Sequence, residues 1–272
     1  ISADSLNTIR DSLHMDKPAV LSSDLRRDNL ILLKKDVTCN KKTLEARLEF
    51  RIKKLCKLID KYHKDGSVLI FAQTTTYVDA LYNILGEIYP GDVTRYHSRI
   101  KPERRKKQLL FDFLQGKRKI MIATSAFSMG IDVADIELVV HFNAPISMTD
   151  YIQQIGRAGR DGRKAHCVLF YDQNGDDEAI SNSFIKKAKK QSPKAAKVIK
   201  TKLSQVHDFI HSDSCMVCDI LEASMKRKPA SAAPYARRNG GIANDYERIR
   251  YSYLFTKITM QIFGNSKYYR TK

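Results

Sequence analysis

Two arginines in the segment Gln153–Gly162 have the residue type and spacing that suit phosphate chemistry most directly. The segment reads QQIGRAGRDG, so Gln153, Arg157 and Arg160 stand at positions i, i+4 and i+7, which one helix would present along a single stripe. An arginine is always charged and forks onto phosphate oxygens, and glycines let another backbone approach closely. The segment therefore predicts a site for a triphosphate. The alternative is an arginine-rich helix end that a glycine terminates.

Polar residues also follow three predicted strands where each strand ends. Because the carboxyl ends of parallel strands meet at one edge of a sheet, where ligands bind, we expect these side chains to share that edge. They are Gln73, Thr74, His97, Thr124 and Ser125. The loop Ser125–Asp132 (SAFSMGID) adds Gly130 and Asp132, which suit a sugar–phosphate chain and a ribose hydroxyl. Each residue alone fits an ordinary loop, so the prediction depends on their common position.

The elements that position these residues follow from hydrophobic periodicity. Apolar residues recur every three or four positions in four segments, which predicts helices over 44–62, 78–88, 104–115 and 147–155. Continuous apolar runs between polar residues predict buried strands at 67–72, 93–97, 119–124, 137–142 and 166–171. A further strand is possible at 29–33. This alternation predicts an α/β fold: a parallel sheet with helices on both faces, followed by a small, mostly helical C-terminal region.

The composition restricts the class of partner and the compartment. Of 272 residues, 48 are Lys or Arg and 30 are Asp or Glu, giving a net charge of +18 that favours polyanions, with nucleic acid ahead of an anionic membrane surface. Five scattered cysteines in a chain of this size indicate a reducing, intracellular compartment. No apolar run approaches the roughly 20 residues that cross a bilayer, so no membrane partner is expected.

A lysine-rich stretch follows the last predicted strand. Residues 186–202 contain eight lysines in seventeen positions, with Pro193 between them. A solvated helical face or linker accounts for this pattern most simply. A surface that faces phosphates is the alternative, because each neutralised phosphate adds affinity that does not depend on sequence.

Several motifs in order resemble one known family. The segments VLIFAQTT (68–75), YHSRIKPERRKKQLLFDFLQGKRKIMIATSAFSMGID (96–132), VVHFNAPISMTDYIQQIGRAGRDG (139–162) and HCVLFY (166–171) are similar to the RecQ branch of superfamily 2 helicases. Within that branch the chain most resembles Bloom-type members. The resemblance runs over roughly residues 21–224.

The resemblance implies a domain organisation. Residues 1–22 correspond to the end of a first helicase lobe, 23–180 to the RecA-like second lobe, and 181–228 to a degenerate zinc-binding-like helical subdomain. A basic loop (229–250) and the start of a winged-helix domain (251–272) follow. The phosphate-binding loop GxxxxGK(S/T) is absent from this sequence. ATP and Mg²⁺ would therefore be shared with a first lobe, and hydrolysis is expected only in its presence.

The resemblance also implies roles for the residues above. Arg157 and Arg160 match the arginines that complete the ATP site, Gln153 matches the family glutamine before them, and Gly130 and Asp132 lie near the nucleotide. Gln73, Thr74, His97, Thr124 and Ser125 lie in motifs that line the single-strand track. The implied protein is a nuclear, ATP-dependent 3′–5′ DNA helicase of repair and recombination, acting on single-stranded and branched DNA.

The sequence departs from the family pattern at three places. Ser128 replaces the first glycine of AFGMGID, and Gln154 and Ile155 replace the acid and serine of QESGRAGRDG. In the zinc region, Cys215 matches one ligand but Phe209 occupies the place of another. A substitute site of His207, His211, Cys215 and Cys218 is not expected, because four ligands along one helix would span roughly 16 Å. Zinc is therefore not predicted. These departures motivate the alternative of a non-catalytic DNA-binding or scaffold protein; an RNA-unwinding relative is a further alternative.

Overall fold

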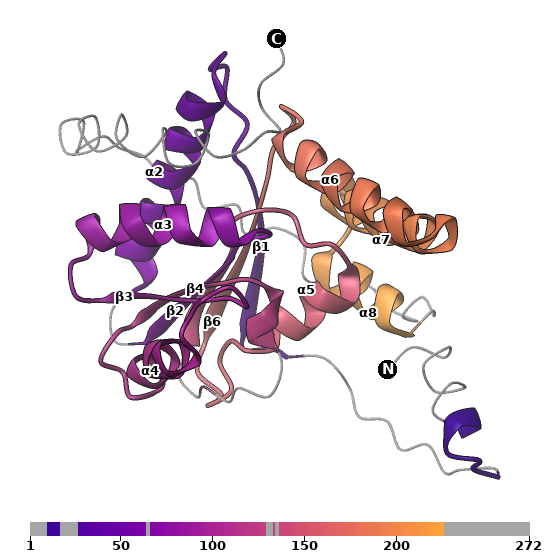
Figure 1. Ribbon diagram of the computed structural model, residues 1–272, viewed down its shortest axis with the longest axis horizontal. Helices are drawn as coiled ribbons and strands as arrows, with labels where there is room; N and C mark the ends of the chain where they lie inside the picture. The colour runs from indigo at the N-terminus through magenta and orange to yellow at the C-terminus, as the bar shows by residue number, and fades with distance from the viewer. Residues whose placement is uncertain (1–9, 17–26, 64–65, 129–132, 134–135, 226–272) are drawn as a thin grey trace.

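A parallel six-stranded sheet forms the centre of the protein (Figure 1). The computed structural model describes residues 10–16, 27–63, 66–128, 133 and 136–225. The strand order is β1-β6-β5-β2-β4-β3. Along the chain the strands are β1 (Leu30–Asp36), β2 (Ser67–Phe71), β3 (Val93–Tyr96), β4 (Ile120–Ala123), β5 (Ile136–His141) and β6 (Ala165–Tyr171). The predicted fold class is confirmed, including the first strand.

Helices cover both faces of this sheet. They are α2 (Leu44–Tyr62), α3 (Thr75–Ile88), α4 (Glu103–Leu114), α5 (Met148–Ile155), α6 (Asp176–Gln191), α7 (Pro193–His211) and α8 (Met216–Met225), with a 3₁₀ turn at Ser125–Ser128. Side-chain oxygens of Thr43, Thr74, Ser147 and Ser192 accept hydrogen bonds from the backbone at the starts of α2, α3, α5 and α7. Such caps satisfy N–H groups that a helix leaves unpaired at its first turn.

Each face of the sheet has its own hydrophobic core because alternate residues of a strand point to opposite faces. In β2, Val68 and Ile70 pack under α2 and α3, whereas Leu69 and Phe71 pack in the second core. Residues of α4, α5, α7 and α8 complete the second core. All five residues of β2 are buried, as expected of a strand at the centre of a doubly covered sheet.

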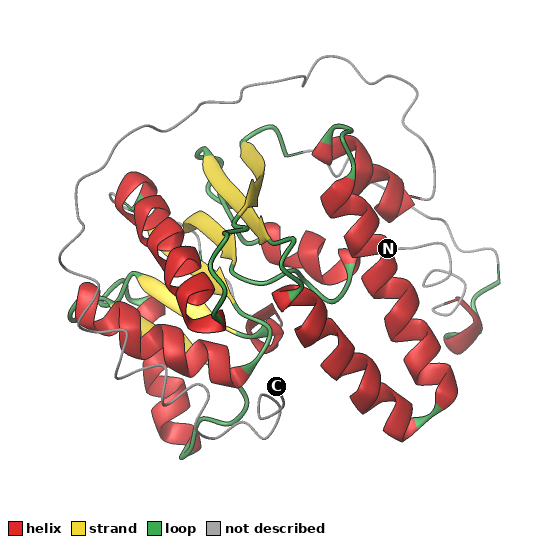
Figure 2. Cartoon of the chain, turned by 90° about the horizontal axis from the view of Figure 1, so that it is seen from above, coloured by secondary structure: helices red, strands yellow, loops and turns green. Residues whose placement is uncertain are grey.

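The lysine-rich stretch is helical on both sides of Pro193. Helices α6 and α7 lie side by side as a hairpin that extends away from the sheet (Figures 1 and 2). Pro193 occupies the first turn of α7, where its missing N–H removes no helical hydrogen bond. Helix α6 continues across residue 180, where the resemblance implied that the second lobe ends and the zinc-binding-like subdomain begins. None of the helices that the structure describes has the length and apolar character to cross a membrane.

The region of the predicted zinc-like subdomain corrects one expectation. We treated 207–218 as a single helix, but α7 ends at His211 and α8 begins at Met216. The connecting residues include Ser212 and Ser214, whose hydroxyls bond to each other rather than continuing the helix. Among the described residues, no group of three or more His, Cys, Asp or Glu side chains could hold a metal ion. The predicted basic loop (229–250) and winged-helix start (251–272) lie outside the described residues.

A buried arginine joins α2 to the end of the sheet. Arg51 is 5% exposed, and its Nη2 lies 3.1 Å from Asp172 Oδ2 and 2.7 Å from Asp177 Oδ2. Asn143, which follows β5, donates to Asp177 Oδ1 at 3.2 Å. Because a buried charge is costly unless it is paired, these contacts fix α2, the loop after β5 and the start of α6 together.

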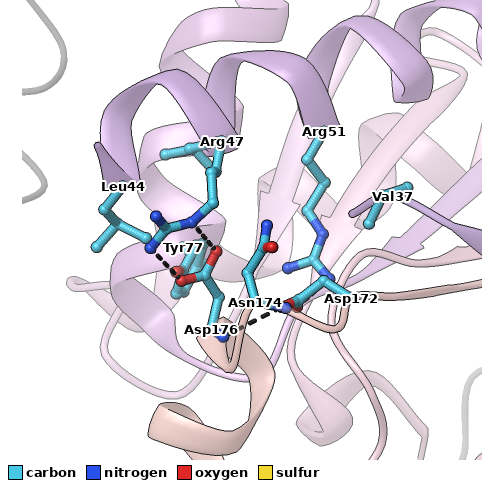
Figure 3. Close-up of a pocket in the computed structure, with 9 residues that line it drawn as sticks. Val37, Leu44, Arg47, Arg51, Tyr77, Asp172, Asn174 and Asp176 are labelled. Atoms are coloured by element: carbon cyan, nitrogen blue, oxygen red, sulfur yellow. Dashed lines mark hydrogen bonds and ion pairs between the residues drawn. The ribbon is translucent and has the colours of Figure 1, made fainter. Parts of the chain in front are cut away.

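The pocket beside this network is structural (Figure 3). Arg47 at its rim forms two hydrogen bonds with Asp176, of 2.9 and 2.8 Å. The free volume is about 10 Å³, close to what one water molecule requires. The pocket is therefore too small for a nucleotide.

We predict that Arg51→Met lowers the free energy of unfolding by about 3–5 kcal/mol, because it leaves two buried carboxylates without their cation. Lys53→Met, two residues along the same helix, removes only a surface pair with Glu49 and should cost less than about 1 kcal/mol. Urea unfolding of both variants measures the difference. Equal losses would show that the buried network contributes no more than a surface pair.

Candidate functional site

The predicted polar edge exists as a continuous end of the sheet. Strands β2, β4 and β3 are neighbours, and their last residues Phe71, Ala123 and Tyr96 stand in register. The residues that follow these strands therefore lie along one edge. They are Gln73, Thr74, His97, Thr124 and Ser125. Gly130 and Asp132, which we also expected here, lie outside the described residues.

Gln73 and Thr74 shape the backbone at this edge. Gln73 Nε2 donates to the carbonyl of Ala144 at 2.7 Å, which joins the loops after β2 and β5. The Thr74 hydroxyl oxygen accepts from the backbone N–H of Tyr77 at 3.2 Å and so starts α3. The amino end of α3 therefore points to the same edge, where its dipole favours an anion.

His97 supports the neighbouring loop. Its ring is 3% exposed, and Nδ1 accepts a hydrogen bond of 3.2 Å from the backbone N–H of Arg99. The proton of the neutral ring then lies on Nε2, which donates to Asp79 Oδ1 at 2.9 Å. Asp79 also pairs with Arg95 at 2.6 Å. In this arrangement both ring nitrogens of His97 are engaged within the chain, so the ring positions the loop that follows β3.

Thr124 and Ser125 lie at the end of β4. Thr124 is half-buried, and its carbonyl accepts from the N–H of Phe127 at 3.0 Å, which forms the 3₁₀ turn. Ser125 is exposed at the first position of that turn. Ser125 is thus one of the predicted track residues whose side chain faces solvent.

The arginine segment differs from its predicted form. Helix α5 ends at Ile155, so Gln153 is helical while Arg157 and Arg160 lie in the turns that follow. The prediction of one helical stripe is therefore wrong. Gly159 adopts φ +53°, and a Cβ there would lie 2.6 Å from the carbonyl oxygen of Arg163. This left-handed, closely packed residue does not continue a right-handed helix.

The two arginines have different environments. Arg157 is 9% exposed, whereas Arg160 is exposed and its Nε donates to the carbonyl of Gly156 at 3.4 Å. Gln153 is exposed on α5. Arg160 and Gln153 can therefore reach a ligand outside the lobe, and Arg157 is largely enclosed by it.

The turns that carry Arg157 and Arg160, which we call the arginine turns, lie away from the polar edge. The N–H of Gly159 donates to the carbonyl of Ile136 at 2.9 Å, and Ile136 is the first residue of β5. A six-residue strand is on the order of 15–20 Å long. The arginines therefore lie toward the amino end of β5, while Gln73, Thr124 and Ser125 lie at the carboxyl ends of the neighbouring strands. We expected the polar residues to share the carboxyl edge, and the structure places the arginines apart from them.

Two residues before β1 hold the arginine turns in place. Arg27 Nη2 donates to the carbonyls of Ala158 and Gly159, at 3.1 and 2.6 Å. Asn29 Nδ2 donates to the carbonyls of Gly159 and Arg163, both at 2.8 Å. Sequence reasoning missed both residues. No local pattern signals a contact across about 130 positions, and only the pairing of β1 with β6 makes it.

Gln154, one of the departures from the family pattern, belongs to the core beneath α5. Its Oε1 accepts from His141 Nε2 at 2.8 Å, and both side chains are buried. Burial lowers the pKa of His141 to about 4, so the ring is neutral near pH 7. A neutral amide suits a neutral imidazole, and this bond explains why a glutamine fits here.

One family model matches the part of the chain that contains this segment. Residues 51–162 match the family described as the helicase conserved C-terminal domain. The architecture is similar to that of a Saccharomyces cerevisiae Dbp5 variant bound to RNA and ADP BeF₃, with a TM-score of 0.52 and 22% identity over 74% of this chain and 53% of that one. The chain thus has a RecA-like fold, similar to that of helicase C-terminal lobes.

Curated relatives of this chain include both RecQ-type DNA helicases and an RNA helicase. The ATP-dependent DNA helicase RecQ of Bacillus subtilis is 32% identical over 64% of this chain and 29% of its own length. The ATP-dependent DNA helicase hus2/rqh1 of Schizosaccharomyces pombe is 32% identical over 63% and 12%. An ATP-dependent RNA helicase of Dictyostelium discoideum is 31% identical over 51% and 12%. The chain spans less than a third of the length of these relatives.

We predict that Gly159→Ala destabilises the lobe more than Gly91→Ala. Both glycines have positive φ, which costs an alanine about 1–2 kcal/mol. A Cβ at Gly91 would meet nothing within 4 Å, whereas at Gly159 it would press on a backbone oxygen, adding about 1–3 kcal/mol. Thermal or urea unfolding of the two variants measures the difference. Equal losses would show that the turn around Gly159 relaxes freely.

Proposed function

We propose that this chain is the second motor lobe of an ATP-dependent 3′–5′ DNA helicase of RecQ, Bloom-like type. In this proposal the arginine turns complete an ATP and Mg²⁺ site on a first lobe, and the polar edge forms part of the single-strand track. The observation that supports it best is that the arginine turns lie toward the amino end of β5, whereas the polar edge lies at the carboxyl ends of β2, β4 and β3. A nucleotide at the arginine turns and a single strand of DNA at the polar edge can then be bound at the same time, and closure of the two lobes can couple ATP hydrolysis to movement of the DNA.

We assign different roles to the two arginines. Arg160 is the finger, because it is exposed and its backbone is fixed by the Gly159 turn. Arg157 is a positioning residue, because it is 9% exposed within the lobe. A guanidinium that reaches a transferring γ-phosphoryl group stabilises the charge that develops on its oxygens. Gln153 is exposed on the last turn of α5, and we assign it a contact with the nucleotide. Gly130 and Asp132 are assigned to nucleotide binding as well.

The nucleic-acid partner is single-stranded or branched DNA, contacted along the polar edge. Exposed Ser125 and the amino end of α3 at Thr74 offer donors to phosphates, while Gln73, His97 and Thr124 keep the loops in place. Zinc has no role in this proposal. The protein acts in the nucleus, in DNA repair and recombination.

A non-catalytic scaffold remains the second candidate function. Ser128 and Gln154 depart from the motor pattern and motivate it. The hydrogen bond from His141 to Gln154 favours the motor, because it shows that Gln154 is accommodated in the core although it departs from the family pattern.

In the protein that carries both lobes, Arg160→Ala should lower DNA-stimulated ATP turnover by about 10³-fold or more, because a finger contributes roughly that factor. Affinity for single-stranded DNA should stay within about threefold. Arg163→Ala is the matched control, since Arg163 is three residues away, exposed and paired with Asp161 at 2.6 Å. It should leave turnover within about twofold. Full turnover in Arg160→Ala would refute the finger assignment, and no turnover in the unaltered protein would favour the scaffold.

Single-stranded DNA and RNA of equal length distinguish the remaining alternative. Stimulation of ATP turnover by DNA alone supports the proposal. Stronger stimulation by RNA would assign the protein to RNA unwinding, as the names of some relatives state for those proteins.

A further inference from the structure

A group of lysines lies on and beside β1, the outer strand of the sheet, and the motor proposal does not use them. Three lysines of α2 stand at i, i+3 and i+7, so they share one face of the helix. We call Lys54, Lys57 and Lys61 the α2 lysine row. Its length along the helix axis is roughly 10 Å. Lys35 of β1 lies next to the row, on the same face of the sheet as Leu33, which packs under α2.

Among the described residues, these like charges are gathered without a carboxylate ion-pair partner. Lys35 is half-buried, and burial together with the three charges of the row lowers its pKa. Two acids of the same helix are engaged elsewhere. Asp60 accepts from the Tyr89 hydroxyl at 2.7 Å, and Glu49 pairs with Lys53. Gathering four cations costs free energy that a bound polyanion would offset.

Two aromatic rings flank the row, and each already has a neighbouring side chain against its ring. Lys54 Nζ lies 5.0 Å from the ring centroid of Phe50, and Lys61 Nζ lies 4.9 Å from that of Tyr62. Tyr62 also stacks on His166, with centroids 3.9 Å apart. Proteins that hold single strands stack bases on open aromatic faces. Here each ring already has a lysine against it and Tyr62 also stacks on His166, so the surface offers cations to phosphates more readily than platforms to bases.

We propose that Lys35 and the α2 lysine row bind the phosphate backbone of a nucleic-acid duplex, at a site separate from the polar edge. A duplex carries one negative charge about every 1.7 Å along its axis, so several phosphates lie within the length of the row. The polar edge lies on β2, β4 and β3, and β1 is at the opposite margin of the sheet. One lobe can thus contact a single strand at one margin and the unopened duplex at the other.

The test uses the 272-residue chain and does not depend on ATP turnover, so its failure is distinct from failure of the motor proposal. The triple variant Lys54→Gln, Lys57→Gln, Lys61→Gln removes the row while keeping long polar side chains. The matched control, Lys186→Gln, Lys190→Gln, Lys197→Gln, removes the same charge from exposed positions of the α6–α7 hairpin. Circular dichroism checks that both variants are folded.

Fluorescence anisotropy with a labelled blunt duplex gives affinity as a function of salt. At about 50 mM salt the row variant should bind the duplex at least about tenfold more weakly, and its salt slope should fall by about 2–3, since each lost phosphate contact reduces the slope by about 0.9. The hairpin control should change the slope by less than about 1.

Three outcomes would overturn the proposal. An unchanged slope in the row variant would mean that the row meets no duplex phosphate. Equal losses in both triple variants would mean that net charge, rather than this surface, governs binding. A loss confined to a single strand of the same sequence would assign the row to the strand track instead.

Discussion

The pairing of Arg51 with Asp172 and Asp177 is the interaction on which the arrangement of this lobe depends. A guanidinium this deeply enclosed has no alternative partner, so α2 must lie where the end of β6 and the start of α6 meet. Asn143 extends the same network to the loop after β5. Through one side chain, the register of α2 over the sheet is fixed. The lysine row beside β1 and the core under α2 and α3 both follow from that register.

A second constraint acts at the arginine turns. Backbone carbonyls of residues 158, 159 and 163 accept hydrogen bonds from Arg27 and Asn29, and Gly159 bonds to the first residue of β5. These contacts place a rigid, left-handed turn at the amino end of the sheet. The polar edge at the other end is shaped by helix starts and loop-to-loop hydrogen bonds. The lobe therefore presents the two proposed functional surfaces in a fixed relation, as the proposed transmission of lobe closure requires.

Much of this architecture was predictable from local pattern. Buried strands are continuous apolar runs and helices repeat every three or four residues, so β2, α2 and α3 followed directly from the sequence, and parallel strands then place Gln73 and Thr124 at one edge. The arginine stripe was mispredicted because periodicity cannot show that Gly159 has no room for a Cβ. Likewise, the pairs formed by Asn29 with Gly159 and by Arg51 with Asp177 join distant segments. Such contacts exist only once the sheet has assembled, and no short window of sequence contains both partners.

The pairing of β1 with β6 has a consequence for how the lobe is made. Leu30 stands beside Ala165, so within the described residues the first strand of the sheet pairs with the last one alone. Loop closure over such a separation costs entropy before any contact is formed. During synthesis β1 emerges before β6, and the two strands cannot pair until β6 has left the ribosome. Arg27 and Asn29 precede this same strand, so the hydrogen bonds with which they hold the arginine turns depend on a pairing that a chain interrupted before residue 165 could not form.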